Sequence, residues 1–158
     1  MKPVIFVHGL ESSSQGSKAS WFRGHFPEMI IPNFRGALSE RLESLDAVLA
    51  GCDDLIMIGS SFGGLMATIF ALEKAERVRR LILLAPALNF PDFAKYHGRV
   101  TTVPARLYIG SKDTVCPPTI VVPVASEVFT DLIVDETDDD HLLRKTFNNI
   151  RWRELLEH

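Results

Sequence analysis

The segment Gly59-Ser60-Ser61-Phe62-Gly63 constrains the fold more than any other part of the chain. It follows a short apolar run, Asp54 to Ile58, which predicts a buried strand, and it precedes residues 62–74, whose apolar side chains recur at helical spacing. A serine in the pattern G-x-S-x-G between a strand and a helix lies on a sharp, strained turn that exposes its hydroxyl. Because a Cβ atom at either flanking glycine would collide with the neighbouring strand or helix, the turn needs both glycines.

Strand-like and helix-like segments alternate along the whole chain. This alternation predicts an α/β layered fold with a mostly parallel sheet of about six strands. The candidate strands are Val4–Val7, Met29–Ile31, Leu55–Ile58, Leu81–Leu84, Arg106–Ile109 and Asp131–Val134. Besides residues 62–74, helices are expected over residues 38–49, ended by Gly51, and over residues 142–155. Prolines and a glycine between Pro86 and Val103 predict a loop or a very short lid.

Length and composition indicate one globular domain. With 158 residues, 46% hydrophobic and 23% charged, the chain is large enough for a substantial core. We expect a single domain over residues 1–155, with residues 156–158 a possible tag remnant because the chain ends in Leu-Glu-His. The net charge of −3 argues against nucleic acid or an anionic membrane as a partner.

The chain shows no sign of export or membrane insertion at the level of sequence. No apolar run approaches the roughly 20 residues of a membrane span, and the N-terminus leads directly into the first candidate strand. Cys52 and Cys116 are isolated and are expected to be buried free thiols rather than a disulfide. A cytoplasmic location is therefore the expectation.

A reactive serine requires a base and an acid that orients the base. One known chain order is Ser, then Asp or Glu, then His, and this sequence offers Ser61, Asp113 and His141 in that order. Asp113 directly follows a candidate strand, so its carboxylate is expected at the same edge of the sheet as Ser61. The alternatives are that Asp113 is an Asx-turn residue in a polar loop, and that Asp92, which follows the preceding strand, is the acid.

His141 is the best candidate for the base among the histidines. It lies after the last candidate strand and before the last candidate helix. His8 is expected to brace the turn after the first strand, and His25 and His97 are expected on the surface. The sequence therefore predicts a Ser61–His141–Asp113 catalytic triad.

The three aspartates that precede His141, Asp138 to Asp140, also invite a metal-site interpretation. Three consecutive carboxylates cannot all face one ion, and no further ligand cluster is apparent in the sequence. We interpret them as a solvated turn that caps the following helix, and we expect neither a metal nor an organic cofactor, because nucleotide-binding fingerprints are also lacking.

An oxyanion hole needs two preorganised N–H groups. The amide of Phe62, directly after the serine, is one candidate, and the amide of Leu10 in the loop after the first strand is the other. Four aromatic residues are candidates for an apolar acyl-binding rim, although each could equally be an ordinary packing residue: Phe34, Phe90, Phe93 and Tyr96.

Two motifs together resemble a known family. The loop His8-Gly9-Leu10-Glu11-Ser12-Ser13-Ser14, continued by Ser17-Lys18-Ala19, resembles the HG-x-x-S-S loop and S-x-K-A segment of the YqiA-type esterases, a group of short, lidless α/β-hydrolases. Gly59-Ser60-Ser61-Phe62-Gly63-Gly64 resembles their G-S-S-x-G-G elbow, and Asp113 and His141 fall at the acid and histidine positions. The resemblance implies a compact three-layer α/β-hydrolase fold without a cap domain.

The same resemblance implies serine-dependent hydrolysis of small carboxylic esters, with a small-molecule acyl ester as the partner. A shallow site without a cap favours acetyl or butyryl esters over long-chain ones. Thioesterase, amidase, perhydrolase or acyltransferase activity would use the same triad. A non-catalytic ligand-binding protein on this fold is the alternative from a different class.

Overall fold

The computed structural model describes residues 2–157, and its strands form one parallel sheet in the order β1-β2-β3-β4-β5. The strands are β1 (Val4–Val7), β2 (Leu55–Ser60), β3 (Val78–Leu84), β4 (Ala105–Gly110) and β5 (Leu132–Thr137). The helices are α1 (Ser17–His25), α2 (Leu38–Val48), α3 (Phe62–Glu73), α4 (Pro118–Val128), α5 (Arg144–Asn149) and α6 (Trp152–Glu157). Two short 3₁₀ helices are η1 (Ala75–Arg77) and η2 (Pro91–Tyr96).

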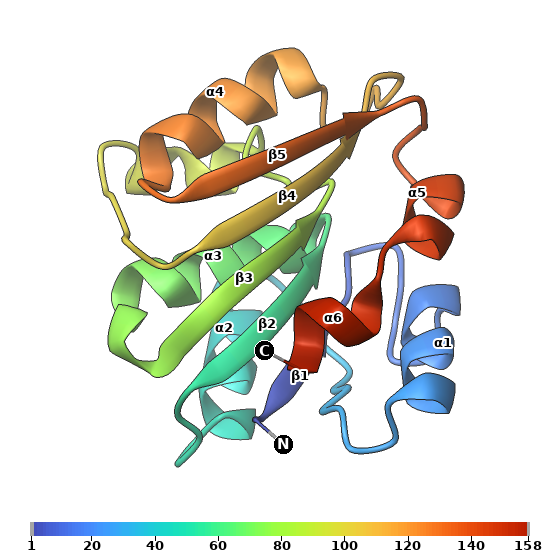
Figure 1. The fold of residues 1–158 in the computed structure, drawn as a ribbon. Helices are drawn as coiled ribbons and strands as arrows, with labels where there is room; N and C mark the ends of the chain where they lie inside the picture. Colours follow the sequence, from blue (N-terminus) through green and yellow to red (C-terminus); the bar gives the residue numbers. More distant parts are fainter. Residues whose placement is uncertain (1, 158) are drawn as a thin grey trace.

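The molecule has three layers, with α2, α3 and α4 covering one face of the sheet and α1, α5 and α6 covering the other (Figure 1). Alternate strand residues divide between the faces: Met57 packs with the first helix layer, and Ile56 and Ile58 pack with the second. Because the strands are buried on both faces, they are continuous apolar runs in the sequence. The three-layer fold without a cap domain among residues 2–157 confirms the predicted architecture.

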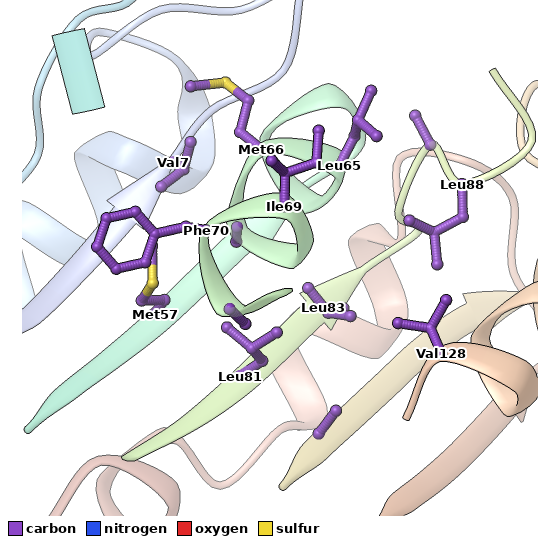
Figure 2. Close-up of a cluster of buried hydrophobic side chains, with 14 of the residues drawn as sticks. Val7, Met57, Leu65, Met66, Ile69, Phe70, Leu81, Leu83, Leu88 and Val128 are labelled. Atoms are coloured by element: carbon purple, nitrogen blue, oxygen red, sulfur yellow. The ribbon is translucent and has the colours of Figure 1, made fainter. Parts of the chain in front are cut away.

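Helix α3 is the central element of the larger core cluster. Figure 2 shows Leu65, Ile69 and Phe70 of this helix lying over Met57 and Leu83 of the sheet, all buried. A helix that is apolar on nearly every side is expected where other elements surround it. This packing fixes the start of α3, and therefore the serine that precedes it, against the sheet.

The expected strand at Met29–Ile31 is not a strand in the structure, so the described sheet has five strands rather than six. Ile30 forms only an isolated parallel bridge with Ile5, supported by two backbone hydrogen bonds to β1. The residue that would extend the pairing is Pro32, which has no N–H to donate, so the ladder stops there.

The expected single C-terminal helix over residues 142–155 is two short helices. Ile150 has an extended backbone between α5 and α6, and the indole Nε1 of Trp152 donates to the carbonyl of Phe147 at 3.1 Å. This bond satisfies a carbonyl at the end of α5 and turns the chain into α6. Leu156, within the expected tag remnant, is buried in the core, whereas His158 lies outside the described residues.

The segment between Pro86 and Val103 is anchored rather than loose. It contains η2, whose Phe93 and Tyr96 are buried in the core cluster beside α3.

Within residues 2–157, no helix is both long enough and apolar enough to cross a membrane.

Candidate active site

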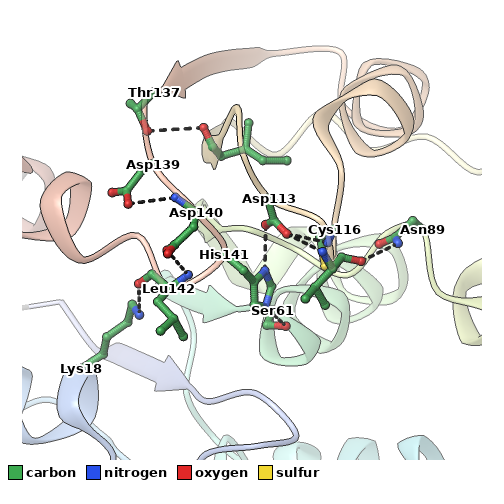
Figure 3. A network of polar contacts seen from close by, with 12 residues as sticks. Lys18, Ser61, Asn89, Asp113, Cys116, Thr137, Asp139, Asp140, His141 and Leu142 are labelled. Atoms are coloured by element: carbon green, nitrogen blue, oxygen red, sulfur yellow. Dashed lines mark hydrogen bonds and ion pairs between the residues drawn. The ribbon is translucent and has the colours of Figure 1, made fainter.

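Three side chains that follow different strands meet at the carboxyl edge of the sheet (Figure 3). Ser61 follows β2, Asp113 follows β4 and His141 follows β5. Ser61 Oγ lies 3.0 Å from His141 Nε2, and His141 Nδ1 lies 2.7 Å from Asp113 Oδ2. The structure therefore brings together the serine, base and acid that the sequence predicts, in hydrogen-bond contact.

The backbone at Ser61 is strained. Its φ of +55° and ψ of −116° lie in a region that non-glycine residues rarely adopt. Backbone hydrogen bonds to β3 and the residues beyond it hold the turn: Ser61 N–H donates to Leu84, and the Ser61 carbonyl accepts from Ala87 N–H, both at 2.9 Å. The strain exposes Oγ above the end of the sheet, as the G-x-S-x-G pattern predicts.

The two glycines of the pattern permit this turn. A Cβ at Gly63 would lie 1.9 Å from the carbonyl oxygen of Val7, at the end of β1. A Cβ at Gly59 would lie 2.5 Å from the carbonyl oxygen of Gly63. Both contacts are with backbone atoms, which cannot move aside as a flexible side chain could, so larger residues are excluded.

Asp113 is both the acid of the triad and an Asx-type turn residue. Its Oδ1 accepts from the amides of Val115 at 2.8 Å and Cys116 at 2.7 Å, while Oδ2 is free to meet His141. Its side chain is 0% exposed. The turn and the catalytic geometry, which sequence reasoning treated as alternatives, therefore occur together: the turn amides hold the carboxylate that orients the imidazole.

His141 is held as the tautomer that a base requires. Because Nδ1 faces the Asp113 carboxylate, Nδ1 carries the proton and donates it, which leaves Nε2 to accept the Ser61 hydroxyl proton. The loop around it is fixed as well, since the Leu142 amide donates to Asp140 Oδ1 at 3.0 Å and Lys18 Nζ donates to the Leu142 carbonyl at 2.7 Å.

The candidate oxyanion amides lie beside the serine. Within residues 2–157, neither the Leu10 amide nor the Phe62 amide donates to a protein acceptor. The loop carrying Leu10 packs on the elbow. A Cβ atom added to Gly9 would lie 3.3 Å from Ser61 Cβ and 3.8 Å from the Phe62 nitrogen. Two unpaired N–H groups beside a nucleophile are what a developing oxyanion needs.

The buried imidazole of His8 holds this loop through two hydrogen bonds. Its Nε2 accepts the amide proton of Phe34 at 2.9 Å, so the ring proton is on Nδ1, which donates to the Gly9 carbonyl at 2.7 Å. Because the Gly9 carbonyl and the Leu10 N–H belong to one trans peptide, fixing the carbonyl also fixes the direction of the amide. Burial lowers the pKa of His8, and the charge of Arg41 lowers it further, against a raising effect of the Gly9 hydrogen bond.

A pocket of about 540 Å³ opens over Ser61 and His141. Its apolar wall includes Leu10, Phe90 and Val115, together with Phe6 and Leu142, and its charged side chains are Glu11 and Lys18. A larger hollow of about 780 Å³ lies along β4, β5, α5 and α6 and does not include the serine.

The four aromatic residues expected at the pocket rim separate in the structure. Phe90 lines the pocket, whereas Phe93 and Tyr96 are buried in the core and stack on one another with ring centroids 5.7 Å apart. Phe34 is buried behind His8 with ring centroids 5.6 Å apart. For these three residues the packing interpretation holds, because all three side chains are buried. Val115, which sequence reasoning missed, shares the pocket wall with Phe90.

The other candidates lie away from the triad. Asp92 is exposed on η2, and His25 and His97 are at the surface.

Asp139 is buried and accepts from both the amide and the hydroxyl of Thr146 in α5, so it supports that helix as expected but from a buried rather than a solvated position. In residues 2–157, no cluster of three or more His, Cys, Asp or Glu side chains could hold a metal ion.

Both cysteines are free thiols, with Cys116 buried and Cys52 half-buried. Burial, with the Asp113 charge, raises the pKa of Cys116 to about 12. A thiol held in its neutral form is a poor nucleophile, so Cys116 packs beside the triad without competing with Ser61.

Comparison with known proteins identifies the fold. A family described as "alpha/beta hydrolase fold" matches residues 49–100, which contain the elbow. A putative hydrolase from Agrobacterium vitis superposes with a TM-score of 0.79 at 17% identity, covering 98% of this chain and 90% of that one. This is an α/β hydrolase fold.

Two further structures share this α/β hydrolase fold. Est1E from Butyrivibrio proteoclasticus, in a complex with ferulic acid, gives a TM-score of 0.77 at 15% identity over 98% of this chain and 88% of its own. An esterase from Pyrococcus furiosus gives 0.75 at 16% identity over 99% and 80%. A comparison with curated protein sequences finds no match.

Proposed function

We propose that the chain is a serine hydrolase that cleaves small carboxylic esters through an acyl-enzyme. The observation that carries the proposal is the continuous hydrogen-bonded series from Ser61 through His141 to Asp113, with the serine on a strained elbow. The α/β hydrolase fold and its likeness to an esterase from Pyrococcus furiosus support it. We also propose membership of the short, lidless esterase group that the HG-x-x-S-S and G-S-S-x-G-G segments resemble.

In the first half of the reaction, Ser61 Oγ attacks the ester carbonyl while His141 Nε2 takes the hydroxyl proton. The carbonyl oxygen gains negative charge and accepts hydrogen bonds from the Leu10 and Phe62 amides. His141 then returns the proton to the departing alcohol, which leaves the acyl group on Ser61. Asp113 keeps Nδ1 protonated and stabilises the transient imidazolium.

In the second half, water replaces the alcohol. His141 takes a proton from water as it attacks the acyl carbonyl, and the same proton returns to Ser61 Oγ when the carboxylic acid leaves. No metal or organic cofactor takes part in these steps.

The pocket argues for small substrates. The pocket of about 540 Å³ has an apolar wall at Leu10, Phe90 and Val115, and no cap domain within residues 2–157 covers it, so a long acyl chain would extend into solvent. We expect acetyl and butyryl esters to be hydrolysed faster than palmitoyl esters, as measured by kcat/KM across a 4-nitrophenyl ester series.

The first experiment is intact-mass analysis after treatment with a small fluorophosphonate. Wild-type protein should gain one label, and the Ser61→Ala variant should gain none. A folded wild type that stays unlabelled would contradict an activated serine and would favour a non-catalytic ligand-binding role. If labelling succeeds but acyl-CoA thioesters turn over faster than oxygen esters, thioesterase activity replaces the ester assignment.

A further inference from the structure

Lys18 connects the catalytic pocket to a second hollow. Its side chain lines the pocket over Ser61, and its Nζ donates to the carbonyl of Leu142, the residue after the triad histidine (Figure 3). It also lines an adjoining pocket of about 320 Å³, which shares Ser17, Lys18 and Leu142 with the first. A substrate group in the second hollow would therefore lie next to a bound ester.

The Lys18 ammonium has no carboxylate partner within residues 2–157. It lies 5.8 Å from the centre of the Phe147 ring, and its one hydrogen-bond acceptor there is the neutral Leu142 carbonyl. Partial burial removes hydration from the Lys18 ammonium, and the neutral carbonyl replaces only part of it, so an anion beside Lys18 would be stabilised.

Nearby acidic groups are already engaged. Asp139 accepts from Thr146, and Asp140 accepts from the Leu142 amide, so both attract Lys18 only from a distance. Burial and the charge of Arg144 lower the pKa of Lys18, against the raising effect of the two aspartates.

Arg144 adds a second positive charge at the same place. It lines the second pocket with Lys18 and Asn148, and its exposed side chain makes neither an ion pair nor a hydrogen bond with any described residue. Glu11 lines the catalytic pocket but not the second one. The polar residues that line the second hollow are therefore the cations Lys18 and Arg144, with Asn148 and Ser17, and no carboxylate side chain lines it.

The geometry points to an anion subsite formed by Lys18 and Arg144, which selects esters that carry a carboxylate away from the scissile bond. This inference rests on the proposed ester hydrolysis and names its substrate class. The apolar wall at Phe90 and Val115 holds the uncharged part of the substrate, and the carboxylate replaces the hydration that Lys18 loses on burial.

Two matched substrate pairs test the inference. The 4-nitrophenyl half-ester of adipic acid against 4-nitrophenyl hexanoate places the charge on the acyl side, and 4-acetoxybenzoate against its methyl ester places it on the alcohol side. We expect kcat/KM to favour the charged member in at least one pair by about tenfold, the size of a partly exposed charge-assisted hydrogen bond.

Variants then assign the preference to residues. Lys18→Met and Arg144→Gln should each reduce kcat/KM for the charged ester several-fold more than for its neutral partner, while Lys18→Arg should retain most of the preference. Lys95→Met, an equal loss of charge on exposed η2, is the control and should leave the ratio unchanged.

The outcomes separate this inference from the proposed function. If wild type hydrolyses none of the four esters and takes no fluorophosphonate label, the proposed function fails. If the neutral esters are hydrolysed but neither pair favours its charged member, only the anion subsite fails. If Lys18→Met slows charged and neutral esters equally and Arg144→Gln changes neither, Lys18 only positions the His141 loop and the subsite is overturned.

Discussion

At each end of the sheet an aspartate carboxylate accepts a hydrogen bond of the same length, with different consequences. At the carboxyl end Asp113 Oδ2 meets His141 Nδ1 at 2.7 Å, and at the amino end Asp54 Oδ1 meets Arg79 Nε at the same 2.7 Å. The Asp113 side chain is 0% exposed, whereas those of Asp54 and Arg79 are 40% and 33% exposed. Equal distances therefore mask a difference in solvent screening, which decides how strongly each carboxylate acts on its partner.

The backbone at the carboxyl end is also the more constrained. Ser61, Ala85 and Leu143 have positive φ there, and Gly63 packs directly on the end of β1. At the amino end Asp54 also has positive φ, but its side chain is 40% exposed. Strain in buried backbone persists only where packing and hydrogen bonds over-determine it, so the carboxyl end should tolerate substitution far less.

The largest expected contrast is between the two aspartates. Asp113→Asn should lower kcat by about 10⁴-fold, because the amide favours the wrong imidazole tautomer and cannot stabilise its charged form. Asp54→Asn should leave kcat within about twofold of wild type. Steady-state kinetics with a 4-nitrophenyl ester measures both; a mild effect at Asp113 would remove it from the catalytic series.

The second contrast concerns two histidines near helix and strand ends. His8→Ala should lower kcat by up to about 10²-fold, because the Gly9–Leu10 peptide loses the bond that directs its amide, and one oxyanion donor is worth about that much. His25→Ala, at an exposed residue stacked on Trp21, should leave kcat unchanged. Equal effects of the two variants would show that His8 is not needed to direct the Leu10 amide.

His8 also predicts a pH dependence of stability. Because the pKa of His8 is lowered in the native state, the unfolded chain binds a proton more readily than the folded one. The contribution of neutral His8 to the free energy of unfolding is therefore present above about pH 6.5 and is lost as pH falls below that value. Thermal melts of wild type and His8→Gln across pH 5 to 8 measure it. The melting temperature of wild type should fall more steeply with falling pH than that of His8→Gln. Parallel plots of melting temperature against pH would show that His8 does not cause the dependence.

The third contrast compares two helical glycines. Gly63→Ala should destabilise the fold by at least about 2 kcal/mol, because the new Cβ overlaps the Val7 carbonyl. Gly24→Ala in α1, where no atom lies within 4 Å of the new Cβ, should be neutral or slightly stabilising. Denaturant unfolding measures both, and a tolerated Gly63→Ala would mean that α3 can move away from β1.

The smallest effect is expected at the amino end. Hydrogen bonds from Arg79 and Lys2 hold the pKa of Asp54 below its usual range, so the stability it contributes is present above about pH 4 and is lost as pH falls further. Asp54→Asn should lower the melting temperature slightly at neutral pH and low salt, and the difference should shrink at high salt. A difference that salt does not change would indicate a buried role.

The elbow could be predicted from sequence because its signal is local. Strand, glycine-flanked serine and helix are contiguous in residues 55–73, and each follows from apolar spacing or from steric limits on a Cβ. The pocket could not be predicted in the same way. Phe90 and Phe93 are three positions apart, yet one lines the pocket and the other is buried, because Phe90 is the extended residue that precedes η2 whereas Phe93 lies within the helix.

The sequence by itself determined the α/β alternation in outline, the strained turn at Ser61 and the order in which serine, acid and histidine occur, because these depend on local spacing and backbone sterics. It did not determine every element, since the strand expected at residues 29–31 is absent and helices α1 and α4 were not predicted. Only the tertiary structure decided that Ser61 and His141, 80 residues apart, lie within 3.0 Å, and that Lys18 and Arg144 share a hollow beside them. Pairing of parallel strands aligns their carboxyl ends, and packing of α1 against α5 joins distant segments. Both bring together residues that are far apart in the chain, so local sequence patterns do not predict them.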